Sequence, residues 1–378
     1  MGDKKTVMVL VGTRPEVVKM APVVMELRRR PQVRCLLVST GQHRELLAQA
    51  LASFELIPDA DLRVMRENQD LAGLTARLID GLDRAYREHK PDIVLAQGDT
   101  TTVLAGSLAA FYRRIPVGHV EAGLRTHDFD APWPEEMNRV LSDRLARWCF
   151  APTELAKRNL LAEGVPAGRI YVTGNTVIDA LLFIRARVRA RAPELPEGLS
   201  AAIEGRRVIL VTAHRRESFG EGFERMCRAM RAVVDRFDDV TIVYPVHLNP
   251  NVREPVMRLL AGHGRIRLVE PLGYEAFVWL MDRARFCLTD SGGVQEEAPS
   301  LGKPVLVMRD ATERPEAIEA GTALLVGTDV DRIVGECARL LEDPGEYARR
   351  SVLSNPYGDG RASGRIADIL GGVGRTDS

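Results

Sequence analysis

The stretch Val7-Met8-Val9-Leu10-Val11-Gly12-Thr13-Arg14-Pro15-Glu16 decides the fold class. Five consecutive apolar residues without polar alternation are typical of a strand that is buried on both faces of a sheet. Gly12 ends this strand, and Pro15 is the residue that favours a helix start directly after it. A buried strand that turns at once into a helix indicates a parallel α/β unit.

The same alternation of short apolar runs and longer amphipathic segments fills two halves of the chain. In the first half we expect strands at 7–11, 35–38, 93–96, 117–120, 148–150 and 170–172, and helices at 16–29, 44–54, 71–88, 102–113 and 154–163. In the second half we expect strands at 208–211, 240–244, 266–269, 286–288, 305–307 and 324–326, and helices at 222–237, 252–261, 274–283, 294–301 and 332–341.

These patterns predict an α/β fold with two doubly wound, Rossmann-like domains, residues 1–174 and 175–355. A Pro- and Glu-rich stretch at 185–205 looks like a helix end followed by a linker. Residues 356–378 would form a tail helix that packs back on the first domain. Because ligands of such sheets bind at the carboxyl ends of the strands, two facing sheets predict one shared central cleft.

Composition limits the partners and cofactors. The 52 basic and 52 acidic residues balance, so we expect neither a nucleic-acid nor a membrane-surface binder, which would select a basic excess. The five cysteines are scattered singly, which predicts no disulfide framework and no metal site. The N-terminal apolar run is too short for a signal peptide or a membrane span, so we expect a cytoplasmic protein.

The turn after the first strand, Gly12 to Lys19, is a candidate anion site. A helix start offers free N–H groups to an anion, and Arg14 and Lys19 would add positive charge. The pattern is not G-x-G-x-x-G, which argues against a nicotinamide dinucleotide. The alternative is a simple capped turn with surface charges.

A stronger anion motif follows the strand at 286–288, in Thr289-Asp290-Ser291-Gly292-Gly293-Val294-Gln295-Glu296-Glu297. The two glycines would let the backbone approach a ligand closely, and Ser291 could cap the helix and bond a phosphate oxygen. A glutamate one turn later could bind a ribose diol. A helix with a capping box would explain the serine and one glutamate, but not both glycines.

Acidic residues gather at the carboxyl ends of two first-half strands. Asp99 follows the strand at 93–96, Glu121 ends the strand at 117–120, and Glu135 lies in Trp133-Pro134-Glu135-Glu136. Carboxylates that face one cleft shift each other's pKa and can divide into acid and base roles. Taken singly, Asp99 could be a helix N-cap and Glu135 an exposed first-turn residue.

His214 ends the first strand of the second half, in Thr212-Ala213-His214-Arg215-Arg216. It could donate a hydrogen bond to a diphosphate or act as an acid. A lone histidine is more often structural, but the two neighbouring arginines favour an anion site.

Together these segments resemble the non-hydrolysing UDP-N-acetylglucosamine 2-epimerases. The matching stretches occur in family order over nearly the whole chain: GTRPEVVKMAP, TGQHRELL, QGDTTTVLAGSLAAFYRRIPVGHVEAGLRT, PWPEEMNR, VTGNTVIDAL, VTAHRRESFGEGF, YPVHLNPNV, LTDSGGVQEEAPSLGKPVLVMRDATERPEA and NPYGDGRAS. The resemblance implies a fold like the GT-B glycosyltransferases, a homodimer, and the conversion of UDP-GlcNAc to UDP-ManNAc without a cofactor. The product would supply bacterial surface polysaccharides.

The resemblance also implies roles for single residues. Asp99, Glu121, Glu135 and His214 match catalytic residues, in an anti elimination of UDP to a glycal followed by syn re-addition. The residues implied to hold UDP are Arg14, Lys19, His214, Phe277, Ser291, Gly292, Gly293 and Glu297. Gln42 and His43 match a second UDP-GlcNAc site that activates some members, but Glu45 and Asn68 depart from that pattern.

Three other functions are compatible with parts of this pattern. A hydrolysing epimerase, which releases ManNAc and UDP, would share the same residues up to the glycal. A GT-B glycosyltransferase would need no group to take a C2 proton, which the three carboxylates argue against. A silent nucleotide-sugar sensor could have lost Asp99, Glu121, Glu135 and His214, and here all four are present.

Overall fold

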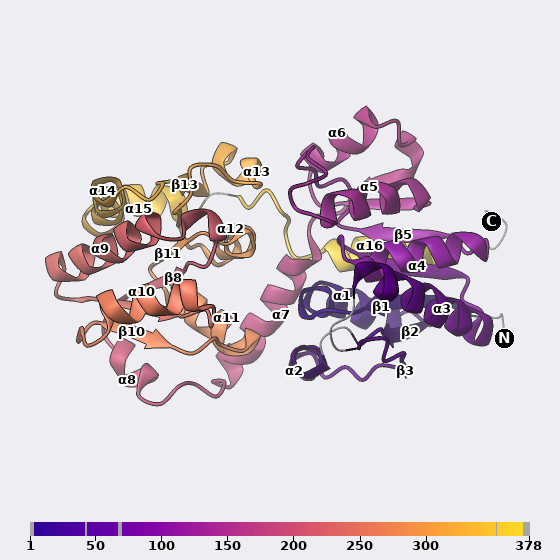
Figure 1. Ribbon diagram of the computed structural model, residues 1–378, viewed down its shortest axis with the longest axis horizontal. Helices are drawn as coiled ribbons and strands as arrows, with labels where there is room; N and C mark the ends of the chain where they lie inside the picture. The colour runs from indigo at the N-terminus through magenta and orange to yellow at the C-terminus, as the bar shows by residue number, and fades with distance from the viewer. Residues whose placement is uncertain (1–3, 42–43, 67–69, 353, 373–378) are drawn as a thin grey trace. The chain divides into compact units, whose positions relative to one another are not determined.

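The computed structural model describes residues 4–41, 44–66, 70–352 and 354–372. They form two compact units, Met1–Leu182 with Tyr357–Ser378, and Phe183–Pro356 (Figure 1). The units divide within one helix, α7 (Thr176–Ala190).

The first unit contains one seven-stranded parallel sheet of order β3-β2-β1-β4-β5-β6-β7. Its strands are β1 (Lys5–Val11), β2 (Val33–Ser39), β3 (Ala60–Asp61), β4 (Ile93–Gln97), β5 (Val117–Val120), β6 (Trp148–Ala151) and β7 (Ile170–Val172). Its other helices are α1 (Arg14–Arg28), α2 (Arg44–Ser53), α3 (Leu71–His89), α4 (Thr101–Tyr112), α5 (Glu135–Leu145), α6 (Glu154–Ala162), η1 (Ala167–Arg169) and α16 (Ala362–Gly372).

The second unit repeats this winding with six parallel strands in the order β10-β9-β8-β11-β12-β13. These strands are β8 (Arg207–Thr212), β9 (Val240–Pro245), β10 (Ile266–Val269), β11 (Phe286–Thr289), β12 (Val305–Val307) and β13 (Ala323–Leu325). Its helices are α8 (Leu199–Ile203), η2 (Arg216–Ser218), α9 (Glu221–Arg236), α10 (Pro250–Leu260), α11 (Tyr274–Arg283), α12 (Gly292–Glu297), η3 (Ala298–Leu301), α13 (Pro315–Glu319), α14 (Val330–Glu342) and α15 (Pro344–Ser351).

The prediction of two doubly wound α/β sheets is confirmed. Apolar side chains of the strands form the core of each unit, for example Met8, Leu10 and Val94 in the first unit and Ile209 and Phe286 in the second. Buried strands of this kind produce the unbroken apolar runs from which the sheets were predicted.

The C-terminal segment returns to the first unit. The yellow helix α16 lies beside the indigo helix α1 in Figure 1. The Asp179 carboxylate of α7 accepts hydrogen bonds from the Ala362 N–H (3.1 Å) and the Ser363 N–H (2.9 Å), which caps the start of α16. Further along α16, the Asp368 carboxylate forms an ion pair with the Arg30 guanidinium at 2.7 Å.

In both sheets the chain order reverses at one point, between β1 and β4 in the first unit and between β8 and β11 in the second. Ligands of doubly wound sheets bind outside the carboxyl ends of the strands at such a switch point. The fold therefore fixes one place in each unit where functional residues should gather.

Candidate functional site

Asp99 lies two residues after the end of β4, at the first switch point, and is held by helix α5. The Arg139 guanidinium donates to its carboxylate at 2.7 Å, and the Asn138 amide donates to its backbone carbonyl at 2.9 Å. Burial raises the pKa of the Asp99 carboxyl; Arg139 opposes this rise, while the nearby Glu121 adds to it. Asp99 is thus a carboxyl that holds its proton more tightly than an ordinary aspartate.

Glu121 follows the next strand, β5, and the register that pairs Gln97 with Val120 brings it beside the end of β4. Its carboxylate accepts hydrogen bonds from the Lys19 ammonium (2.5 and 2.7 Å), the Asn175 amide (3.1 Å) and the Gln97 amide. Its backbone has a φ of 65°, a left-handed conformation that a non-glycine residue adopts at a cost. Lys19, which was expected to bind UDP, thus forms an ion pair with the Glu121 carboxylate.

Glu135 and Glu136 begin α5 but occupy different surroundings. Glu136 is 1% exposed, and its carboxylate accepts hydrogen bonds from the N–H groups of Thr126 (3.1 Å) and His127 (3.0 Å). Glu135 is half-buried. Glu136 therefore anchors the loop before the helix, and Glu135 is the one of the two whose carboxylate is not buried in that loop.

Helix α1 begins at Arg14, one residue before the Pro15 that was expected at its first position, and the N–H groups of the turn before it already have partners. The buried carboxylate of Glu16 accepts hydrogen bonds from the N–H groups of Gly12 (2.7 Å) and Thr13 (2.6 Å) and from the Thr100 hydroxyl (2.6 Å). Burial raises the pKa of Glu16. The expectation that this turn offers free N–H groups is wrong for Gly12 and Thr13, because Glu16 satisfies them from within the motif.

His214 lies at the second switch point, next to the buried carboxylate of Asp290. Because Thr212 pairs with Thr289, Asp290 lies beside the end of β8 and accepts hydrogen bonds from the N–H groups of His214 (2.6 Å) and Arg215 (2.7 Å). The His214 side chain is 40% exposed and lies 3.6 Å from the Asp290 carboxylate. Burial lowers the pKa of His214, which Asp290 partly opposes. The His247 ring stacks on it, with ring centroids 5.5 Å apart.

Ser291 is the N-cap residue of α12, and Gly292 and Gly293 lie in its first turn, although the helix was expected to start at Val294. The Ser291 side chain makes no capping hydrogen bond, so the expected side-chain cap is not formed. A Cβ on Gly293 would meet nothing closer than the Glu297 carboxylate at 3.7 Å, and one on Gly292 would meet the Arg314 guanidinium at 3.6 Å. Neither glycine is therefore required by the packing of the described chain. Glu297, at the end of α12, accepts a hydrogen bond from the Tyr274 hydroxyl at 3.1 Å.

Phe277, also predicted to belong to this site, is a half-buried residue of the neighbouring helix α11.

An arginine network, which the sequence patterns did not indicate, lies after β12. Arg309 is 7% exposed and pairs with Glu217 (2.5 Å) and Glu313 (2.7 Å), while Arg314 pairs with Glu296. Burial raises the pKa of Glu313, but the Arg309 guanidinium overrides it and lowers that pKa to about 2. Paired in this way, these arginines fix the loop beside α12.

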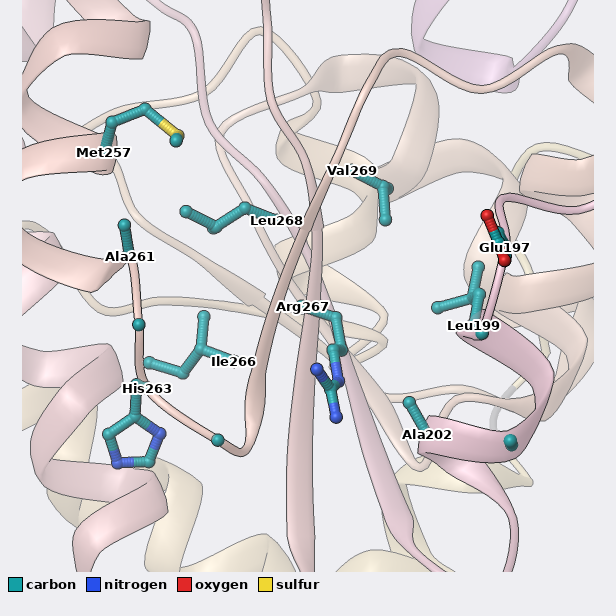
Figure 2. A pocket seen from close by; sticks show the side chains of 14 residues that line it. Glu197, Leu199, Ala202, Met257, Ala261, His263, Ile266, Arg267, Leu268 and Val269 are labelled. Atoms are coloured by element: carbon teal, nitrogen blue, oxygen red, sulfur yellow. The ribbon is translucent and has the colours of Figure 1, made fainter.

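One pocket of the second unit lies away from its switch point. It has a volume of about 720 Å³ and lies beside the edge strand β10, with α8 and the end of α10 as its other walls. Figure 2 shows the Arg267 and His263 side chains that line it. None of the predicted site residues is among the lining residues.

Three further predictions concern a second ligand site, a metal site and a membrane span. Gln42 and His43 lie outside the described residues. Among the described residues, no group of three His, Cys, Asp or Glu side chains could hold a metal ion. No helix in the described ranges has the length and apolar character needed to cross a membrane.

Comparison with known proteins places this arrangement in a family. The family model described as UDP-N-acetylglucosamine 2-epimerase matches residues 25–371. The UDP-N-acetylglucosamine 2-epimerase of Escherichia coli K12 is 55% identical over 96% of this chain and 98% of its own length. That of Bacillus subtilis 168 is 51% identical over 97% and 95%.

The chain belongs to the UDP-N-acetylglucosamine 2-epimerase family.

Solved structures agree with this assignment. The UDP-GlcNAc 2-epimerase from Neisseria meningitidis, a crystal structure bound to UDP-GlcNAc, has a TM-score of 0.86 and 46% identity and covers 97% of this chain and 99% of that one. The predicted resemblance to this family is confirmed, as is the GT-B-like pair of sheets that it implied. The protein is therefore an isomerase of nucleotide sugars by family.

Several buried polar residues at the two edges were not found from sequence. Glu16, His119, Asn175 and Asp290 each bind a functional residue or the turn that carries it. One signal was available: His119 is a polar residue inside an apolar strand, and a buried polar side chain requires hydrogen-bond partners. The other three lie in quoted motifs, but their partners become visible only in three dimensions.

Proposed function

We propose that this UDP-N-acetylglucosamine 2-epimerase interconverts UDP-GlcNAc and UDP-ManNAc by anti elimination of UDP, which gives a glycal, and syn re-addition of UDP. The observation that carries the proposal is a pair of carboxyl groups at the carboxyl edge of one sheet, Asp99 after β4 and Glu121 after β5. Glu135 begins α5, the helix whose Arg139 binds Asp99. Elimination removes a proton from C2, and re-addition returns one on the opposite face. Both steps require carboxyl groups within hydrogen-bond reach.

The different surroundings of Glu121 and Asp99 at the carboxyl edge of the first sheet support this chemistry. Glu121 is bound by an ammonium and two amides, which stabilise its ionised form. Asp99 has a pKa raised by burial, so it takes up a proton more readily. Two neighbouring carboxyls that differ in this way can act as acid and base in the same reaction.

The carboxyl edge of the second unit is the proposed holder of UDP. His214, Ser291, Gly292 and Gly293 would contact the diphosphate, and the absence of any packing reason for the glycines supports a ligand that approaches their backbone. Glu297 would bind the ribose and Phe277 would lie near the uracil.

The leaving diphosphate develops negative charge during elimination. We propose that Arg14, Lys19 and His214 meet that charge. Fixed positive groups of this kind are the largest contribution to catalysis in many enzymes.

We also propose that the protein is a homodimer and that it acts in the cytoplasm. Its product, UDP-ManNAc, would supply surface polysaccharides. The aromatic residues Phe111 and Tyr112 at the end of α4 are 58% and 68% exposed, and exposed apolar side chains of this size support a protein interface. Light scattering on the purified protein tests the dimer. Activation by a second UDP-GlcNAc at Gln42 and His43 stays a prediction.

Incubation with UDP-GlcNAc in heavy water, followed at C2 by NMR, tests the proposed reaction. We expect deuterium at C2 together with UDP-ManNAc. Free ManNAc would mean hydrolysis instead, and transfer of the sugar without C2 exchange would mean a glycosyltransferase. Bound UDP-GlcNAc that remains unchanged would indicate a sensor and contradict the proposal.

A further inference from the structure

His119 lies inside β5, two residues before Glu121, and is fully buried. Both of its ring nitrogens have partners: Nδ1 lies 2.6 Å from the Asp143 carboxylate of α5, and Nε2 lies 2.7 Å from the Gly98 carbonyl. A buried histidine of this kind could serve the core alone. Its second partner, however, is the carbonyl of the peptide that leads into Asp99.

The partners determine how many protons the ring carries. The Gly98 carbonyl can only accept, so Nε2 carries a proton. The Asp143 carboxylate also accepts hydrogen bonds from the Arg125 guanidinium (2.7 Å) and the Gly123 N–H (3.1 Å), which favours its ionised form, so Nδ1 donates as well. A ring that donates from both nitrogens is an imidazolium.

The charges around the ring agree with this assignment. Burial disfavours the charged ring, but the Asp143 carboxylate overrides burial and raises the pKa of His119, against the opposing charge of Arg125. Burial also raises the pKa of Asp143, while His119 and Arg125 together bring it below its ordinary value. Arg125 in turn pairs with Glu163 at 2.6 Å, so the network contains two cations and two anions.

Gly98 is held by β5 through both its N–H and its carbonyl. The Gly98 N–H donates to the Val120 carbonyl at 3.1 Å, and the Gly98 carbonyl accepts from His119. Gly98 has a φ of 82°, so this turn has a conformation that few other residues would hold. The other anchors of Asp99 come from α5.

We infer that His119 is a buried imidazolium that positions Asp99 by holding the Gly98 carbonyl. It is a positioning residue, because it reaches the substrate only through the Gly98–Asp99 turn. The inference rests on the proposed role of Asp99 in proton transfer at C2. Displacement of a reacting group by about 1 Å can cost a factor of about 100 in rate.

Two variants separate the two ring nitrogens. In His119→Gln the amide nitrogen can take the place of Nε2 and still donate to the Gly98 carbonyl. In His119→Asn the amide nitrogen takes the place of Nδ1, so the bond to Asp143 can survive and the bond to Gly98 is lost. We expect kcat for C2 deuterium exchange to fall about 100-fold in His119→Asn and less than about tenfold in His119→Gln, with KM changed less than kcat in both.

Val117→Ala is the matched control for loss of stability. Val117 is a buried residue at the amino end of β5, so its truncation weakens the same strand without touching the turn. We expect its kcat to stay within about threefold of the wild-type value. Equal losses in Val117→Ala and His119→Asn, or equal losses in the Asn and Gln variants, would overturn the positioning role.

Nitrogen-15 NMR of the wild-type protein tests the charge without relying on activity or on a stable variant. We expect one of the seven histidines to show two protonated ring nitrogens at neutral pH and to remain so above the ordinary histidine pKa of about 6.5. Loss of this signal in either His119 variant assigns it. A neutral His119 ring at pH 7 would overturn the imidazolium.

These outcomes can be told apart from failure of the proposed function. No C2 exchange in the wild-type protein would remove the reaction but leave the NMR result to decide the charge of His119. Undiminished exchange in Asp99→Asn would instead show that holding Asp99 in place has no catalytic consequence, which overturns the positioning role.

Discussion

The carboxyl edges of the two sheets share a layout and differ in charge. Each ends its first strand in a turn whose N–H groups bind a buried carboxylate, Glu16 in the first unit and Asp290 in the second. Beyond that shared feature, the first edge presents Asp99 and Glu121, while the second presents His214 and the glycine turn of a helix start. The doubly wound fold thus supplies the same positions twice, and the side chains at those positions give them different chemistry.

The difference is also one of protonation. On the first edge, burial raises the pKa of the Asp99 carboxyl. On the second, Arg309 lowers the pKa of the Glu313 carboxyl to about 2 although burial opposes it. A carboxyl that is easily protonated suits proton transfer, and one that stays charged suits a fixed ion pair. This contrast supports the proposal that the first edge carries the reaction and the second holds UDP.

Apart from the loss of Asp99 itself, the largest effect is expected from the two adjacent glutamates of α5. Glu135→Gln is expected to slow C2 exchange about 1,000-fold with little change in melting temperature, because it removes a proposed acid–base group. Glu136→Gln should cost about 1–3 kcal/mol of stability, because that buried carboxylate anchors the Thr126 and His127 N–H groups. Exchange rates and denaturant unfolding of both variants check this. A loss of stability in Glu135→Gln together with a loss of exchange in Glu136→Gln would contradict these two roles.

A smaller effect is expected on the binding edge. Gly293→Ala places a methyl group where the chain itself leaves room, so stability should change by less than about 1 kcal/mol, whereas UDP affinity should fall about tenfold or more. Gly335→Ala, in the exposed part of α14 with nothing within 4 Å, is the control and should leave UDP binding unchanged. Calorimetric titration with UDP measures both, and unaltered affinity in Gly293→Ala would place the ligand elsewhere.

The smallest expected effect is a shift in titration. Because the pKa of Asp99 is raised, the folded protein binds this proton more tightly than the unfolded chain, and ionisation of Asp99 removes stability as the pH rises from 3.8 through the raised value. Arg139→Gln removes the cation that opposes this rise, so the carboxyl should titrate at still higher pH. Carbon-13 NMR of the aspartate carboxyls follows it. A midpoint at or below 3.8 in the wild-type protein would contradict the assignment.

The sequence predicted the strands closely because the strands are buried on both faces. The expected strand at 117–120 is β5, and that at 93–96 is β4 without its last residue. The two-residue strand β3 was missed because Ala60 and Asp61 are too few for any periodicity. Helix α7 was expected only as a helix end before a linker, α5 only through the alternative that Glu135 is a first-turn residue, and α8 was not expected.

Site residues could be predicted where a motif lies at the end of a strand. They could not be predicted where two residues far apart in the sequence meet only through the register of neighbouring strands. Asp99 and Glu121 were placed at one edge because parallel strands end together. The contact between Asp290 and His214 joins residues 76 positions apart, and it follows only from the register of β8 with β11. The pairing of Lys19 with Glu121, 102 positions apart, likewise needs the folded sheet.

The division of work between the two edges is tested most directly by measuring Asp99→Asn and His214→Asn side by side. For each variant, deuterium exchange at C2 and UDP affinity are determined on the same preparation. We expect Asp99→Asn to abolish exchange while UDP affinity stays within about tenfold, or about 1.4 kcal/mol, and His214→Asn to weaken UDP binding by more than that. A large loss of UDP affinity in Asp99→Asn, with unaltered affinity in His214→Asn, would contradict the account.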